Sequence, residues 1–174
     1  YRLWTEREQG SMTPRSPTEI LEADLTPLVL ELTLWGVGDP SELSWLTPPP
    51  SGAVTQARDL LIRLNALDST GHITPHGRAM AELPLHPRLA HMLLRAQALR
   101  LTTLACDVAA LLSGRDILRI HPGRRNADLR IRLDALHGQQ DLAGGTAIDR
   151  AAFQLAQRTA DLWRRQIART TTTL

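Results

Sequence analysis

The sequence predicts a mainly α-helical protein in which a winged-helix domain with a short β-wing passes directly into a helical bundle. Three observations lead to this fold class. Apolar residues recur at helical spacing along most of the 174 residues. The extended segments are too short to form a sheet of their own. Residues 71–90, GHITPHGRAMAELPLHPRLA, alternate strand and helix signals with almost no linker between them.

Two helices are predicted in the first half of the chain. Thr26 and Pro27 begin the first one, which Gly36 ends. A loop with several prolines and glycines follows, and a second amphipathic helix runs over residues 54–67. Its apolar face is made of Ala57, Leu60, Leu61, Leu64 and Leu67. Trp35 and Trp163 are candidate core residues, and Trp45 caps the first core or faces a neighbouring domain.

The joint between the two halves is predicted from prolines. Residues 72–74 form a short strand, and Thr74 with Pro75 begins a helix that Pro84 stops. Pro87 then lies at the first position of a helix that extends to Leu99.

The second half is predicted to hold three more helices. They cover residues 102–112, 129–136 and 146–169, and residues 113–126 form a basic connection. Thr146 followed by Asp149 is a capping-box variant at the start of the last helix. The apolar stripe of that helix comprises Ile148, Ala152, Leu155, Leu162 and Ile167.

The composition excludes several chemistries. All 20 basic residues are arginine, so a phosphate-binding loop of the GxxxxGK[ST] kind, a Schiff-base lysine and a Ser-Lys dyad are absent from the chain. No apolar run approaches the roughly 18 residues that cross a bilayer. The single cysteine, Cys106, lies among apolar residues and is predicted to be a buried structural thiol of a cytoplasmic protein.

We predict no catalytic, cofactor-binding or metal-binding residues. His72 and His76 have the spacing of two ligands on one helix, but Pro75 begins a new element between them and no third ligand is near in sequence. Ser113 and Asp116 lack a histidine at a convincing distance for a Ser-His-Asp arrangement.

Charge is distributed unevenly. Residues 1–85 hold 6 arginines and 11 acidic residues, a net charge of −5, whereas residues 86–174 hold 14 and 7, a net charge of +7. Such asymmetry is typical of a segment that faces nucleic acid, and a solvated basic face is the alternative.

An ordered pattern spans residues 67–93. It consists of Leu67-Asp68, Gly71, Ile73-Thr74, Gly77, Met80-Ala81, Leu83-Pro84-Leu85, Pro87, Leu89-Ala90 and Met92-Leu93. The pattern resembles the accessory (HA2) region that follows the motor domains in DEAH-box helicases. The segments DLTPLVLELTLWGVGDPSELSWLTPPP and HPRLAHMLLRAQALRLTTLACDVAALLSGRD are similar to the bacterial branch called HrpB. Residues 1–4 resemble the final strand of the second RecA-like domain, and residues 160–167 resemble the end of the ratchet-like bundle.

The resemblance implies three parts: residues 1–13 as the tail of a RecA-like domain, residues 14–86 as the winged helix and residues 87–174 as the ratchet-like bundle. It also implies a longer parent protein, an ATP-dependent helicase that moves 3′ to 5′ along a single strand of RNA or DNA. ATP and Mg²⁺ would bind its RecA-like motor domains. Those domains and an OB-fold would be partners of this region within the same chain, and the region alone would be inactive.

The basic half supplies the candidate contacts to single-stranded nucleic acid. They are Arg115, Arg119, Arg124 and Arg125 in the basic connection and Arg158, Arg164 and Arg165 on the last helix. The alternative for these residues is a solvated face with local pairs such as Arg130 with Asp134 and Asp161 with Arg165.

Two other functions stay open. A helical protein-docking module fits the same pattern of helices. A winged-helix regulator needs a basic recognition helix, but residues 54–67 offer only Arg58 and Arg63 beside Asp59.

Overall fold

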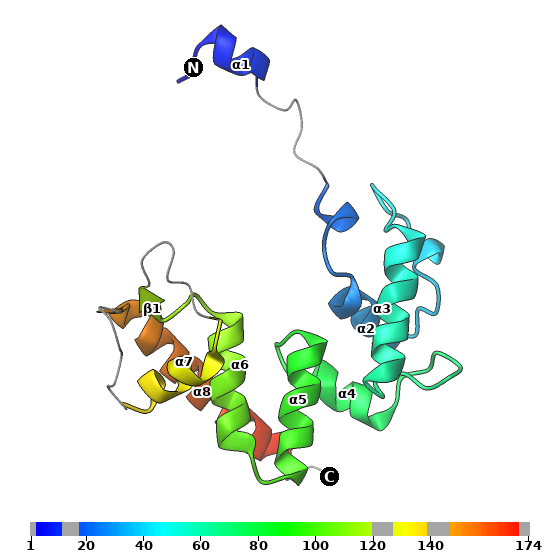
Figure 1. Ribbon diagram of the computed structural model, residues 1–174. Helices are drawn as coiled ribbons and strands as arrows, with labels where there is room; N and C mark the ends of the chain where they lie inside the picture. The colour runs from blue at the N-terminus through cyan, green and yellow to red at the C-terminus, as the bar shows by residue number, and fades with distance from the viewer. Residues whose placement is uncertain (1–2, 12–17, 120–126, 139–146, 171–174) are drawn as a thin grey trace. The chain divides into compact units, whose positions relative to one another are not determined.

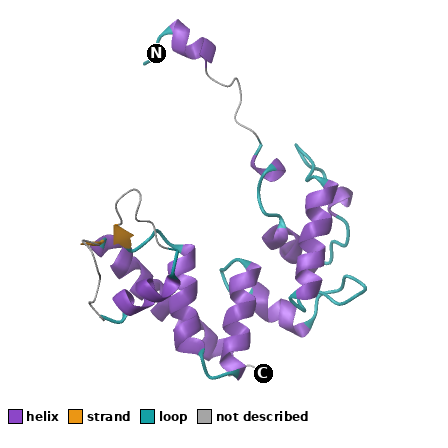
Figure 2. Ribbon diagram, viewed as in Figure 1, coloured by secondary structure: helices purple, strands orange, loops and turns teal. Residues whose placement is uncertain are grey.

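The computed structural model describes residues 3–11, 18–119, 127–138 and 147–170 (Figure 1). Helices dominate these residues, and one short strand pair accompanies them (Figure 2). The predicted fold class, mainly α with a winged helix, is confirmed. The chain divides into two compact units, Tyr1–Ile73 and Thr74–Leu174. The domain boundary after residue 86 stays a prediction.

The first unit is built around a pair of helices, α2 (Thr26–Leu34) and α3 (Ser51–Arg63), which pack against each other. Short helical segments accompany them, namely α1 (Glu6–Ser11), η1 (Glu19–Leu21) and η2 (Pro40–Glu42). The buried side chains of α2 and α3 form an apolar core that includes Val29, Leu30, Leu32, Val54, Leu60 and Leu61. Trp45 is half-buried, and its indole Nε1–H donates to the carbonyl oxygen of Pro40 at 2.7 Å.

The first described residues differ from the prediction made from the sequence, and the short helix α1 follows them. Leu3 and Trp4 form a bend, not the end of a strand, and residues 1–2 lie outside the described part of the chain. Thr5 and Glu8 explain the helix, because each side chain accepts a hydrogen bond from the backbone N–H of the other, at 2.8 and 3.2 Å. This reciprocal arrangement is a capping box.

Helix α3 ends earlier than its apolar spacing predicts. Asn65 has a φ of +55°, and the N–H of Ala66 donates to the carbonyl of Leu61 at 2.8 Å, which closes the helix. Leu67 is buried without being helical, since it forms an antiparallel bridge with Ile73. The predicted strand of the wing is therefore a single bridge that closes the turn of residues 68–72.

The second unit consists of five helices: α4 (Pro75–Ala81), α5 (Pro87–Ala98), α6 (Thr102–Ser113), α7 (Leu129–Leu136) and α8 (Arg150–Thr170). Helix α5 packs against α4 and α6, and α6 also contacts α7 and α8, so α6 is the centre of the bundle. As predicted, the hydroxyl of Thr74 caps α4, accepting from the N–H of Gly77 at 2.9 Å, and Pro87 begins α5.

Two short strands were not predicted. Strand β1 (Leu118–Arg119) lies within the predicted connection, and it pairs antiparallel with β2 (Ala147–Ile148), Leu118 opposite Ile148. Because residues 147–148 are extended, α8 begins at Arg150, and the predicted helix start is wrong. Thr146 lies outside the described residues.

The apolar predictions for the long helix are partly wrong. Trp163 is buried, as expected, but Leu155 and Leu162 are 59% and 56% exposed. The buried face of α8 instead consists of Ala152, Ala156, Ala160, Trp163 and Ile167. Trp35 is 75% exposed and is not a core residue.

Candidate nucleic-acid interface

The start of α8 is organised by one carboxylate. The Oδ1 atom of Asp149 accepts hydrogen bonds from the N–H groups of Ala151 and Ala152, both at 3.1 Å, so Asp149 is the N-cap. Its Oδ2 atom accepts from Nε and a terminal nitrogen of Arg119 at 3.1 and 2.9 Å. The N–H of Ala152 and then the Arg119 guanidinium hold the pKa of Asp149 below its usual range. The Arg119 side chain is nevertheless 70% exposed, so part of it faces solvent.

Arg164 lies in a network that joins three helices. Its guanidinium pairs with Asp107 of α6 and, at 2.5 Å, with Asp161 one turn earlier on α8. The other carboxylate oxygen of Asp107 lies 3.0 Å from Nε2 of His137, which follows α7. Arg164 thus uses its charge inside the bundle, and its Nε–H is buried without a partner among the described residues. The local pair of Asp161 with Arg165 is wrong, because Arg164 takes that place.

A cavity of about 310 Å³ opens beside this network. Leu136, His137, Gln157 and Asp161 line it together with Asp107 and Arg164. Its charged groups are paired with one another, and the described residues contain no cluster of three or more metal ligands.

Arg158 and Arg165 lie on a different side of α8. Both are exposed, and neither has a hydrogen bond or ion pair with a described residue. They are seven residues apart, close to two helical turns, so they share one face about 10 Å apart along the axis. Arg115 in the segment before β1 is likewise exposed and makes no hydrogen bond or ion pair with a described residue, although its charge also lowers the pKa of Asp149. Arg124 and Arg125 lie outside the described residues.

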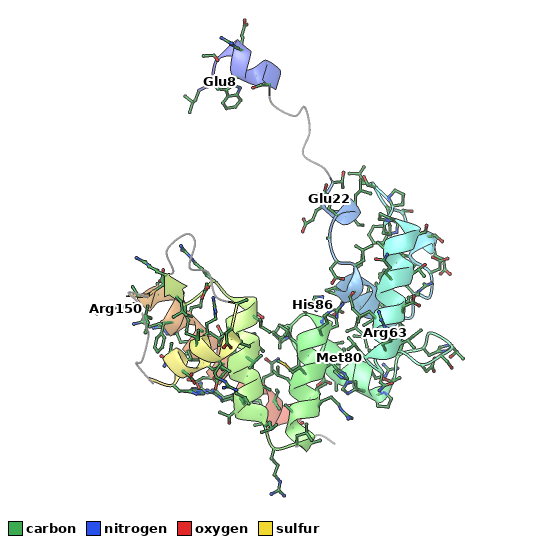
Figure 3. All side chains as sticks on the ribbon, viewed as in Figure 1. Glu8, Glu22, Arg63, Met80, His86 and Arg150 are labelled. Carbon is green, nitrogen blue, oxygen red and sulfur yellow. The ribbon has the colours of Figure 1, made fainter. Side chains whose placement is uncertain are left out.

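The seven candidate arginines therefore differ in how their charge is used. Arg164 is held by two carboxylates, Arg119 by one, and Arg115, Arg158 and Arg165 keep exposed guanidinium groups. Figure 3 labels Arg150 as another arginine of α8, at the end where β2 leads into the helix.

Sequence reasoning missed the acids that organise this region. Asp107 is buried within an otherwise apolar helix, and Asp116 makes a forked pair with Arg132 at 2.6 and 3.0 Å. A lone acid inside an apolar helical run is a visible signal, because a buried carboxylate needs a partner. Its partners, however, come from residues 30 and 57 positions away.

The histidines and the cysteine form no catalytic arrangement in the described residues. His76 lies beside His91, with Nε2 and Nδ1 2.9 Å apart. Burial, followed by the neighbouring His91 and Arg95, lowers the pKa of His76. Cys106 is fully buried, as predicted, and burial raises the pKa of its thiol to about 11. No helix of the described part is long and apolar enough to cross a membrane.

Known proteins match this chain along most of its length. Residues 57–85 match the model of the helicase associated domain (HA2), winged-helix. The ATP-dependent RNA helicase HrpB of Escherichia coli is 38% identical over 67% of this chain and 14% of its own length. The probable ATP-dependent RNA helicase DHX35 of Homo sapiens is 29% identical over 75% of this chain and 19% of its own length.

A crystal structure of the E. coli DEAH/RHA helicase HrpB is similar to this chain. Its TM-score is 0.68 at 27% sequence identity, covering 94% of this chain and 18% of that one. This chain therefore spans less than a fifth of the length of these proteins. The resemblance predicted from the sequence is confirmed: this chain is similar to HrpB and other DEAH-box RNA helicases, and residues 57–85 match the HA2 winged-helix model.

Proposed function

We propose that this chain is the accessory region of an ATP-dependent DEAH-box helicase and that it binds and guides single-stranded nucleic acid during 3′ to 5′ translocation. The similarity to HrpB supports the helicase part of the proposal. The unpaired arginines of the second unit support the part about the strand. They offer charge to phosphates, whereas the described arginines of α3 donate to backbone carbonyls.

The chemistry of ATP hydrolysis belongs to the parent protein in this proposal. ATP and Mg²⁺ bind the RecA-like motor domains, and those domains and an OB-fold are the partners of this region in one cytoplasmic chain. The 174 residues alone have no ATPase activity, because they contain no lysine for a phosphate-binding loop.

The seven predicted arginines are the proposed strand contacts, and they contribute to binding to different extents. Arg115, Arg158 and Arg165 have guanidinium groups available for phosphate, together with the predicted contacts Arg124 and Arg125. The exposed part of the Arg119 guanidinium can contact a phosphate while Arg119 stays paired with Asp149. Arg164 acts mainly by fixing α8 to α6, because a phosphate would have to compete with Asp107 and Asp161.

Binding measured by fluorescence anisotropy at several salt concentrations tests the proposal. Single-stranded RNA or DNA should bind with a slope of log K against log salt of about −0.7 per contacted phosphate. The triple substitution Arg115→Gln, Arg158→Gln and Arg165→Gln should reduce the slope by about 2. Arg58→Gln with Arg63→Gln is the matched control and should leave it unchanged.

Other outcomes contradict the proposal. Absence of binding to any nucleic acid would favour a protein-docking module, for which α6 offers exposed Leu104 and Leu112 and the residue before it, Leu101, is exposed as well. A preference for one duplex sequence would favour a winged-helix regulator. An unchanged salt slope in the triple variant would make these arginines bystanders.

A further inference from the structure

Two leucines on the outer face of α8 are left without a role by the fold. Leu155 and Leu162 are 59% and 56% exposed, and the core of the bundle is built from the opposite face of the helix. A single exposed leucine on a protein surface is ordinary. These two, however, alternate along the helix with Arg158 and Arg165, which are exposed as well.

The alternation follows from helical geometry. At 100° per residue, Leu155, Arg158, Leu162 and Arg165 fall within about 80° of the helix circumference and within about 15 Å along the axis. We call these four residues the outer stripe. Arg164 lies outside it, on the side of α8 that reaches Asp107.

The chemistry of the outer stripe selects its occupant. Two cations without an acidic partner among the described residues call for an anionic ligand, and two leucines call for an apolar one. A single nucleic-acid strand presents both at short intervals, since each phosphate is followed by a base with an apolar face. The net charge of the second unit, +7 from 15 arginines and 8 acidic residues, favours the same ligand.

We propose that Leu155 and Leu162 contact the faces of unpaired bases while Arg158 and Arg165 hold the neighbouring phosphates. The inference rests on the proposed function, because it requires a single strand at α8. It adds Leu155 and Leu162, whose contribution to the affinity for the strand does not depend on charge. Aliphatic contact with a base face makes no hydrogen bond to base edges, so the outer stripe is tolerant of sequence and prefers single strands, whose base faces are accessible.

Charge-dependent and charge-independent contacts are separable by salt. The double variant Leu155→Ala and Leu162→Ala should weaken binding of a labelled oligouridylate roughly tenfold with an unchanged salt slope. The double variant Arg158→Gln and Arg165→Gln should reduce the slope by about 1.4. Leu21→Ala is the control, because Leu21 is 49% exposed but stands between Glu19 and Glu22, and it should change neither quantity.

A strand without bases tests the inference on the unchanged protein. A ribose-phosphate oligomer of abasic residues should bind wild type roughly tenfold more weakly than oligouridylate, with the same salt slope. It should bind wild type and the leucine double variant equally. Circular dichroism checks that the variants remain helical.

Three outcomes would overturn the inference. If the leucine variant binds oligouridylate as wild type does while the arginine variant loses slope, the base contact is wrong and the proposed function stands. Equal affinity of wild type for the abasic and the natural strand leads to the same conclusion. If no strand binds wild type, both proposals fail.

Discussion

The two units use their polar side chains differently. In the first unit, side-chain hydrogen bonds such as those of Thr5 with Glu8 and of Asp39 with Ser41 join residues a few positions apart, whereas Arg58 reaches the carbonyl of Gly38, 20 positions away. In the second unit, ion pairs between different elements join residues 16 to 57 positions apart, in addition to the local pair of Arg164 with Asp161.

This difference assigns different roles to charge. Local caps shape the turns of the first unit, whose net charge is −5 over residues 1–73. Long-range pairs fix α6, α7 and α8 to one another in the second unit. Because a few acids suffice for those pairs, the remaining arginines are left on the surface. The basic surface is therefore what remains of an arginine-rich composition after the bundle has been cross-linked.

The largest expected effects come from the apolar core of each unit. Leu61 in α3 and Leu93 in α5 are both fully buried. Leu61→Ala and Leu93→Ala should each cost about 3 kcal/mol through lost contacts and the cavity left behind. Hydrogen exchange with mass spectrometry should show the loss of protection in residues 18–73 for the first variant and in residues 74–170 for the second. Uniform loss over both units in either variant would refute their independence.

Loss of a carboxylate from the long-range network should destabilise the protein more than loss of a local ion pair. Asp107→Ala leaves Arg164 and His137 without their buried acceptor, and we expect about 2 kcal/mol of destabilisation in chemical denaturation. Asp161→Asn is the control, since Asp161 is 57% exposed and its pair with Arg164 is local, and it should cost less than about 0.5 kcal/mol. Equal effects of the two variants would remove the distinction between the units.

Two glycines of the first unit should respond with opposite signs. Gly71 has a φ of +86°, a conformation that strains any side chain, so Gly71→Ala should cost about 1 kcal/mol. Gly52 lies in the first turn of α3 with open space around its Cα, so Gly52→Ala should stabilise by about 0.5 kcal/mol. Thermal unfolding of both variants provides the measurement, and the same sign for both would show that the turn of residues 68–72 is not fixed as described.

The smallest expected effect is a pH dependence in the second unit. The pKa of His76 is lowered in the folded state from its ordinary value of 6.5, so the folded state binds fewer protons than the unfolded one. The associated stability is fully present above pH 6.5 and declines as the pH falls below it towards the folded pKa. Stability curves from about pH 7.5 to pH 5.5 should show this decline in wild type and a weaker one in His76→Gln. An identical decline in both would exclude His76 as its source.

Local signals made much of the fold predictable. Prolines at the starts of α4 and α5 and the Thr74 cap placed those helices correctly, because each acts on its own turn. The end of α3 and the start of α8 were misplaced. In both cases a residue of helical apolar spacing pairs as an extended residue, Leu67 with Ile73 six positions later and Ile148 with Leu118 30 positions earlier. Such pairing overrides the local preference, and spacing alone carries no signal of it.

The candidate site, like the fold, was predictable from the sequence only in part. The sequence by itself determined the helical architecture, the homology to DEAH-box helicases and the excess of arginine in the second half, because these depend on composition and on neighbours along the chain. Only the tertiary structure decided which arginines are available. Arg164 and Arg165 are adjacent in sequence, yet one points to a buried carboxylate on α6 and the other lies exposed on the outer stripe. The physical reason is that α8 turns by about 100° per residue, so its packing against α6 gives neighbouring side chains different surroundings.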